Sequence, residues 1–191
     1  MSCKAKVGFL GLGAMGLGMA SHLAKEGFDI VGYDLNPQAS SRLESEGGCS
    51  ALSPRQAASG RDLLVVVVAT SDQASTALLG PKAGCVGSLP NGSTILMCIT
   101  AAPEYMLHLK EHLTRLGRSD VNLIDCPISG GEVRAWQGNL SLICSGDQTI
   151  IDKAHDLLKC MSSQLHLIPG GIGRASGVKM VHQILVGVHI L

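Results

Sequence analysis

The stretch "VGFLGLGAMGLGMASHLAKEG" (residues 7–27) places several glycines where an apolar run gives way to an amphipathic one. Gly11, Gly13 and Gly16 have the spacing G-x-G-x-x-G, directly between an expected strand and an expected helix. In this position the first glycine permits a tight turn, the second lets the backbone approach a pyrophosphate, and the third lets the helix pack closely. The helix N-terminus then faces the phosphates. The spacing therefore predicts a dinucleotide-binding turn, and the alternative is a tight strand–helix turn without a ligand.

Asp34 ends the next apolar run, "FDIVGYD", near the offset of about 20 residues expected for an acidic residue that binds the adenosine ribose. A carboxylate there accepts hydrogen bonds from the ribose hydroxyls and repels a 2′-phosphate. No arginine directly follows it in "YDLNPQ". This pattern favours NAD as the cofactor over NADP. In the alternative interpretation, Asp34 caps the helix expected to begin near Pro37, and the two roles can coexist.

Short apolar runs alternate with segments of helical periodicity along most of the chain. The runs are "KVGFLG", "FDIVGYD", "DLLVVVVAT", "STILMCIT", "VNLIDCP", "LSLICSG" and "QLHLIPG", and helices are expected over 14–26, 54–59, 103–117 and 148–160. Continuous hydrophobic runs such as "LLVVVVA" are typical of strands buried on both faces. The alternation predicts an α/β fold, namely a Rossmann-type doubly wound, mostly parallel sheet with helices on both sides.

The end of the chain has a different character. After the glycine-rich break "IPGGIGRAS", the segment "GVKMVHQILVGVHIL" combines helical spacing with strong apolar character, and such a helix needs a partner to cover it. We expect residues 1–173 to form the NAD-binding domain and residues 174–191 to begin an interdomain helix. We expect this helix to continue beyond residue 191, so that part of the natural protein is missing from this chain, and we expect its apolar face to support a homo-oligomer.

Composition narrows the possible partners. The chain has 191 residues and is 46% hydrophobic, which is enough for one sizeable core. Fifteen basic and fifteen acidic residues balance, so neither nucleic acid nor an anionic membrane is an expected partner. No apolar run approaches the roughly 20 residues of a membrane span. Seven scattered cysteines without a CxxC pair argue against a disulfide framework or a metal site and favour a reducing, cytoplasmic compartment.

The glycine stretch resembles the N-terminal signature of the β-hydroxyacid dehydrogenase family, which includes 3-hydroxyisobutyrate, tartronate semialdehyde and threonate dehydrogenases. Three further stretches match the family in the same order. "ITAAPE" (99–104) resembles its Thr-x-x-Pro turn, "DCPISGGEVRAWQGNL" (125–140) its Asp-x-Pro-x-Ser-Gly-Gly substrate loop, and "GGIGRASGVKMVHQ" (170–183) its catalytic helix. The resemblance covers nearly the whole chain and is closest to the threonate dehydrogenase-like branch. It also implies that the helix over 174–191 leads to an all-helical second domain, which is truncated in this chain.

The resemblance implies roles for individual residues. Lys179 would be the catalytic residue. The substrate would be bound by Ser129, Gly130, Gly131 and Gln183, and the cofactor by Gly11, Leu12, Gly13, Ala14, Met15, Gly16, Asp34, Thr70 and Thr100. Two positions depart from the family pattern, because Gln183 stands where the family commonly has Asn, and Arg134 stands where a glycine is usual.

The lysine can also be argued from its own surroundings. Lys179 has apolar neighbours along the expected helix, namely Val178, Met180, Val181, Ile184 and Leu185. An ammonium desolvated among them loses its charge more readily and becomes a usable acid–base catalyst. The alternative is a lysine that snorkels from a core helix into solvent. Gln183, four residues later, shares its helix face.

Other polar residues near these motifs have simpler interpretations. His182 is expected to be a packed helix histidine rather than a substrate contact, and Cys126 a packing residue because no base lies near it in sequence. Ser129 could be an ordinary turn serine. Arg134 and Trp136 either shape the pocket or lie on the surface.

The resemblance implies NAD-dependent oxidation of a small hydroxy acid, 3-hydroxyisobutyrate or threonate-like, to the oxo acid or semialdehyde by hydride transfer. Two alternatives stay open at this point. One is a semialdehyde or glyoxylate-type reductase that uses NADPH. The other is a dinucleotide-binding interaction module without turnover.

Overall fold

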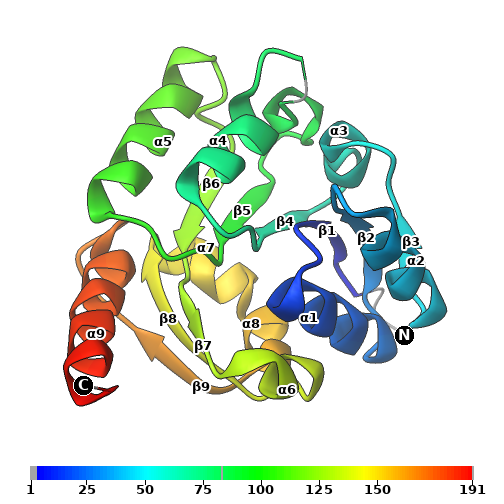
Figure 1. The fold of residues 1–191 in the computed structure, drawn as a ribbon. Coiled ribbons are helices and arrows are strands. Elements are labelled where there is room, and N and C mark those ends of the chain that lie inside the picture. Colours follow the sequence, from blue (N-terminus) through cyan, green and yellow to red (C-terminus); the bar gives the residue numbers. More distant parts are fainter. Residues whose placement is uncertain (1–3, 83, 191) are drawn as a thin grey trace.

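A mostly parallel sheet forms the centre of the computed structural model, which describes residues 4–82 and 84–190 (Figure 1). Its strands are β1 (Lys6–Leu10), β2 (Asp29–Tyr33), β3 (Cys49–Ser50), β4 (Leu63–Val66), β5 (Thr94–Met97), β6 (Asn122–Asp125), β7 (Ile128–Ser129), β8 (Leu140–Gly146) and β9 (Ser162–Leu167). Their order is β3-β2-β1-β4-β5-β6-β8-β7, with β9 beside β8. Pairs from β3 to β6 are parallel, whereas β8 runs antiparallel to β6 and β7. The expected Rossmann-type, mostly parallel sheet is confirmed.

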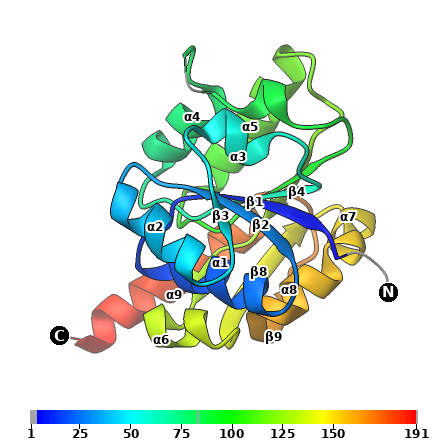
Figure 2. The same cartoon turned by 90° about the vertical axis from the view of Figure 1, so that its right-hand side faces the viewer.

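Helices cover both faces of the sheet. They are α1 (Ala14–Lys25), α2 (Pro37–Ser45), α3 (Pro54–Ala58), α4 (Ser71–Leu79), the 3₁₀ turn η1 (Val86–Ser88), α5 (Pro103–Arg115), α6 (Gly131–Trp136), α7 (Gln148–Lys153), α8 (His155–Met161) and α9 (Arg174–Ile190). In two perpendicular views α3, α4 and α5 lie on one side of the sheet, and α1, α6 and α8 lie on the other (Figures 1 and 2). This arrangement explains why the central strands read as continuous hydrophobic runs.

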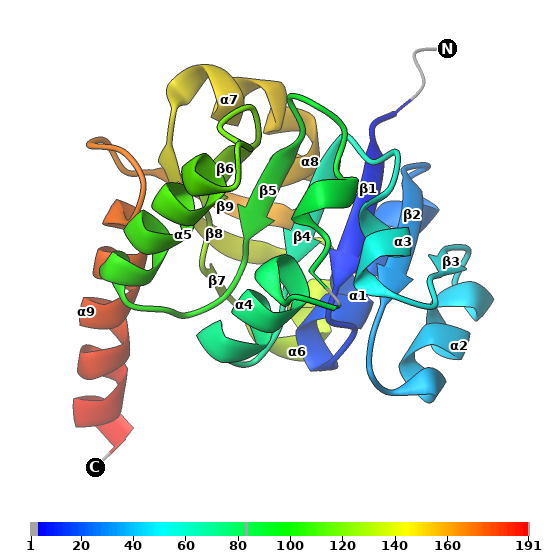
Figure 3. The same cartoon turned by 90° about the horizontal axis from the view of Figure 1, so that it is seen from above.

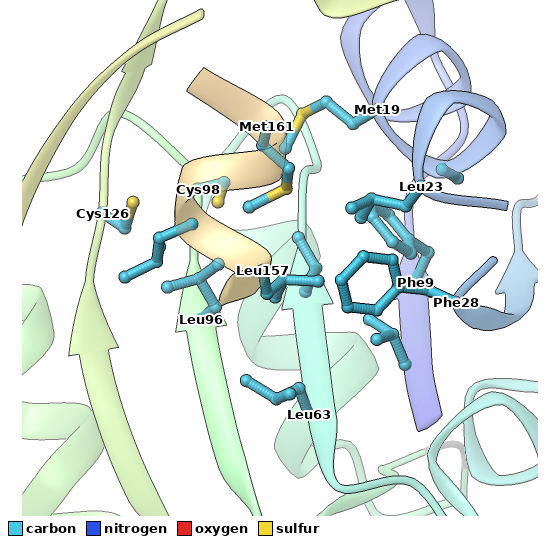
Figure 4. Close-up of a cluster of buried hydrophobic side chains, with 14 of the residues drawn as sticks. Phe9, Met19, Leu23, Phe28, Leu63, Leu96, Cys98, Cys126, Leu157 and Met161 are labelled. Carbon is cyan, nitrogen blue, oxygen red and sulfur yellow. The ribbon is translucent and has the colours of Figure 1, made fainter. Parts of the chain in front are cut away.

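Alternate side chains of each strand enter two separate cores. In β1, Phe9 belongs to the core beneath α1 and α8, where it joins Leu23, Leu96 and Leu157 (Figure 4). The next residue, Leu10, belongs to the core beneath α3, α4 and α5. Both layers are therefore anchored by the same central strands, whose carboxyl ends must carry any ligand site.

Two sequence expectations about secondary structure are wrong. The helix expected over 148–160 is broken at Ala154, whose ψ is 0°, into α7 and α8. The break redirects the chain so that Ile151 and Leu157 both reach the core. The stretch 125–140, expected to be a loop, contains β7 and α6. Because β7 pairs with β8, the backbone of this stretch has hydrogen-bonding partners on a distant strand, which the sequence alone did not reveal.

Helix α9 packs against β6, β8 and α5 at its beginning and then projects beyond the sheet (Figure 3). Its outer half exposes apolar side chains, including Val181, which is 59% exposed, and Ile184, which is 64% exposed. No helix among residues 4–82 and 84–190 is long and apolar enough to cross a membrane.

Candidate active site at the carboxyl edge of the sheet

Gly11, Gly13 and Gly16, which we call the glycine turn, lie between β1 and α1 and at the start of α1, and they serve different physical purposes. Gly11 has φ +94°, a left-handed conformation that favours glycine. A Cβ on Gly16 would lie 2.1 Å from the carbonyl oxygen of Gly11, so the helix can approach the turn only without a side chain there. A Cβ on Gly13 would meet no protein atom within 4 Å. The space beyond Gly13 is therefore open in front of the helix N-terminus, where unpaired N–H groups point.

Asp34 is held at the end of β2 by two backbone donors. Its Oδ2 accepts a hydrogen bond from the N–H of Leu12 at 2.7 Å, and its Oδ1 accepts one from the N–H of Asn36 at 2.7 Å. The cap of α2 is Asn36, whose side chain accepts from the N–H of Gln38, so the interpretation of Asp34 as the helix cap is wrong. The carboxylate is instead tied to the glycine turn and keeps lone pairs for further donors.

A pocket of about 480 Å³ opens between the carboxyl ends of β1, β2 and β4. Its walls include Gly11, Gly13, Asp34, Val68 and Thr76. The pocket lies where the order of the strands reverses, with β2 and β3 on one side of β1 and β4 and β5 on the other. Open α/β sheets bind their ligands at this point. Its size suits part of a dinucleotide.

The remaining predicted cofactor residues lie along the same edge. Ala14 and Met15 form the first turn of α1, and the side chain of Leu12 is buried while its N–H is taken by Asp34. Thr70 caps α4, where its Oγ1 accepts from the N–H of Gln73 at 3.2 Å. Thr100 is exposed between β5 and α5.

Lys179 is buried although it carries an ammonium group. Only 5% of the residue is exposed, and its Nζ donates to the carbonyl oxygen of Ile128 at 2.9 Å and to Ser129 Oγ at 2.5 Å. Burial lowers the pKa of Lys179 below its ordinary value. The desolvation does not come from the helix neighbours named in the sequence analysis, because Val181 and Ile184 face solvent. It comes from the sheet side of the helix.

The predicted substrate residues are only partly brought together. Ser129 ends β7 and contacts Lys179 directly. Gly130 and Gly131 follow with φ +141° and +79° and begin α6 rather than a free loop. Gln183 is exposed one turn beyond the lysine on α9.

His182 and Cys126 have contrasting outcomes. His182 is exposed within residues 4–82 and 84–190, where it lines the groove beside Pro103, so this part of the chain does not pack it. Cys126 is fully buried. Hydrogen bonding with the Cys144 thiol, a contact to Cys98 and burial raise its pKa well above the ordinary value, and its full burial fits a packing role.

Helix α6 packs closely against α1. A Cβ on Gly18 of α1 would lie 2.9 Å from the backbone nitrogen of Trp136 and 3.1 Å from Cβ of Ala135. Trp136 is therefore an interhelical packing residue, whereas Arg134 is exposed. The close contact sets the position of the Ser129 segment relative to the glycine turn.

Sequence reasoning missed a buried polar cluster beside the lysine. Asp125, Ser145 and Ser176 are each at most 1% exposed, and both serines donate hydrogen bonds to the Asp125 carboxylate. The only sequence signal was the acidic residue that begins "DCPISGG". Within residues 4–82 and 84–190, no group of three or more His, Cys, Asp or Glu side chains could hold a metal ion.

A family model described as the NAD binding domain of 6-phosphogluconate dehydrogenase matches residues 6–170. The L-threonate dehydrogenase of Cupriavidus necator is 30% identical over 184 residues, which cover 96% of this chain and 61% of that protein. The chain belongs to the β-hydroxyacid dehydrogenase family. The family resemblance is thereby confirmed, and the match to an NAD-binding family model confirms NAD(P) as the type of cofactor.

Other members of the β-hydroxyacid dehydrogenase family match over the same region. The 2-hydroxy-3-oxopropionate reductase of Escherichia coli K12 is 30% identical over 185 residues, covering 97% of this chain and 61% of that protein. A crystal structure of 3-hydroxyisobutyrate dehydrogenase from Salmonella typhimurium has a TM-score of 0.89 and 34% identity, covering 98% of this chain and 64% of that one. The chain thus spans about three-fifths of the length of these relatives.

Proposed function

We propose that this protein is an NAD-dependent dehydrogenase that oxidises a small hydroxy acid, 3-hydroxyisobutyrate or threonate-like. The observation that carries the proposal is the buried Lys179, whose Nζ meets Ser129 at the carboxyl edge of an NAD-binding sheet. A desolvated amine in this position suits proton transfer, and a hydroxyl beside it suits substrate orientation. The names of the relatives, L-threonate dehydrogenase among them, support the substrate class.

The glycine turn fits a dinucleotide because Gly13 leaves open space before the helix N-terminus. The N–H groups of Ala14, Met15 and Gly16 would bind the pyrophosphate. Asp34 would accept the ribose hydroxyls and repel a 2′-phosphate, so we favour NAD over NADP. Thr70 and Thr100 would line the path toward the nicotinamide. When bound, the cofactor supplies the hydride acceptor of the oxidation.

Lys179 would act on the substrate hydroxyl. In its neutral form, Nζ takes the hydroxyl proton as the carbon–hydrogen bond breaks, and it returns that proton in the reverse direction. Its lowered pKa increases the neutral fraction at physiological pH. Ser129 and the N–H groups of Gly130 and Gly131 would hold the substrate carboxylate, and Gln183 would donate to a substrate oxygen.

The test is a panel of C3 to C5 hydroxy acids offered with NAD or NADP, scored by the absorbance of the reduced cofactor. Reduction that depends on Lys179, and is lost in Lys179→Met, is the expected result. The reverse reaction with semialdehydes is measured in parallel, because one relative is named a reductase. Cofactor binding without any Lys179-dependent turnover in either direction would favour the interaction module instead.

We also infer that copies of the chain associate through the outer half of α9. Its exposed apolar side chains, such as Val181 and Ile184, need cover from water.

The cytoplasm is the compartment we propose, because the cysteines from Cys49 to Cys160 are all free thiols.

A further inference from the structure

Asp125 is a buried carboxylate that the proposed chemistry does not use. It ends β6 with 1% of its surface exposed and accepts hydrogen bonds from Ser176 N at 2.8 Å and Ser176 Oγ at 2.7 Å. Ser145 Oγ, from the neighbouring strand, lies 3.3 Å from it. Burial raises its pKa above the ordinary value, whereas the bonds from Ser176 and Ser145 act in the opposite direction. A desolvated acid is costly, so its retention needs a physical reason.

Ser145 extends the same network to the next amide of α9. It pairs directly with Asp125 across the antiparallel β6–β8 ladder, and its Oγ accepts a hydrogen bond from the N–H of Ala175 at 2.9 Å. The first N–H groups of a helix have no partners within the helix. Here side chains of the sheet take the place of a local cap and satisfy two of them.

This network determines where Lys179 lies. Ser176 and Lys179 are three residues apart on α9, so they lie on the same face of successive turns. The first turn is held to the ends of β6 and β8, while the outer half of the helix is exposed. The ammonium reaches Ile128 and Ser129 only if the first turn keeps this position.

We propose that Asp125 is a positioning residue for Lys179. Together with Ser145 and Ser176 it pins the first turn of α9 to the sheet and thereby keeps Nζ buried against Ser129. Asp125 makes no contact with the lysine's Nζ among the hydrogen bonds of that group, so it acts through the helix rather than as a catalytic residue. The significance for catalysis rests on the proposed function, but the positioning itself can be tested without turnover.

The experiment measures the reactivity of Lys179 toward acetic anhydride as a function of pH, by mass spectrometry of the labelled peptide. The exposed Lys110 serves as the internal reference. Asp125→Asn is the main variant, because it preserves shape but loses one acceptor oxygen and the charge. Hydrogen exchange at the amides of Ala175 and Ser176 is recorded on the same samples, together with urea unfolding.

In Asp125→Asn we expect faster exchange at these amides and a higher titration midpoint for Lys179, since hydration relieves the lowering of its pKa that burial causes. Loss of a nearby negative charge by itself would move the midpoint down. The direction of the shift therefore separates positioning from direct electrostatics. An unchanged or lowered midpoint would overturn the proposal.

A second variant keeps the proposal testable if Asp125→Asn does not fold. Ser145→Ala combined with Ser176→Ala retains the carboxylate and removes the hydroxyl links, and the Lys179 midpoint should again rise. The matched control is Ser93→Ala, a buried serine that donates to Pro90 O and Arg61 O at the opposite end of the sheet. If the double variant and the control lose stability alike and neither moves Lys179, the network is merely structural. None of these readouts needs substrate or cofactor, so a failed turnover assay would be a separate result.

Discussion

Gly13 and Gly16 lie in the same turn but should fail in opposite ways when replaced by alanine. At Gly13, φ is −68° and ψ is −164°, a conformation open to alanine, and the new Cβ meets no protein atom within 4 Å. At a compatible position, Gly→Ala stabilises the folded protein by about 0.4–1 kcal/mol because alanine reduces the conformational entropy of the unfolded chain. Alanine is a poorer N-cap residue than glycine, and this loss offsets a similar amount. The free energy of unfolding of Gly13→Ala should therefore stay within about 1 kcal/mol of wild type.

NAD binding by Gly13→Ala should nevertheless weaken. The methyl group enters the space before the helix N-terminus, and an extra carbon in a packed site typically costs about 1–3 kcal/mol. That cost corresponds to a Kd roughly 5- to 150-fold higher. In Gly16→Ala the Cβ would lie 2.1 Å from the carbonyl oxygen of Gly11, so the backbone must move. A similar overpacking cost then lowers the free energy of unfolding, and each kcal/mol lost lowers Tm by roughly 2–4 °C.

Titration calorimetry with NAD and urea unfolding followed by circular dichroism check both variants. The expected pattern is a stable Gly13→Ala protein that binds NAD poorly and a destabilised Gly16→Ala protein. If Gly13→Ala binds NAD like wild type, the open space is not where the cofactor approaches. If it unfolds as easily as Gly16→Ala, the reasoning from the free Cβ position is refuted.

Further predictions concern the acid, the lysine and α9. Asp34→Ala should weaken NAD more than NADP, measured by calorimetry, and an unchanged ratio of affinities would remove Asp34 from cofactor choice. Lys179→Met should lower kcat about 10²–10⁴-fold in the hydroxy-acid assay while the Kd for NAD stays near wild type. Because burial lowers the folded pKa of Lys179, its charge costs stability at neutral pH, and this cost is lost as pH rises toward the ordinary 10.5. Lys179→Met should therefore have a higher free energy of unfolding than wild type in urea at pH 7, and the difference between the two proteins should narrow at alkaline pH. Val181→Asp with Ile184→Asp should shift sedimentation toward the monomer, and an unaltered distribution would exclude α9 as the contact.

Features that depend only on residues close together in the sequence were predictable. The glycine turn was one, because a left-handed φ at Gly11 and a close approach at Gly16 are local requirements that only glycine meets. Continuous apolar runs such as Leu63–Val66 likewise indicated strands buried on both faces, and their alternation with helical periods predicted a mostly parallel sheet. The break at Ala154 escaped notice, because two short helices and one long helix show the same periodicity.

The surroundings of Lys179 were decided by the tertiary structure alone. Its partner Ser129 is 50 residues away in the chain, and Asp125 and Ser176 are 51 residues apart. Such pairs meet only because β8 lies antiparallel beside β6, and β9, which pairs with β8, leads the chain to α9 at the ends of β6 and β8. The apolar helix neighbours suggested that Lys179 is desolvated, but they face solvent, and the strands supply the burial. Local sequence specifies dihedral angles and periodicity, whereas the environment of a buried charge depends on which distant segments the sheet brings beside it.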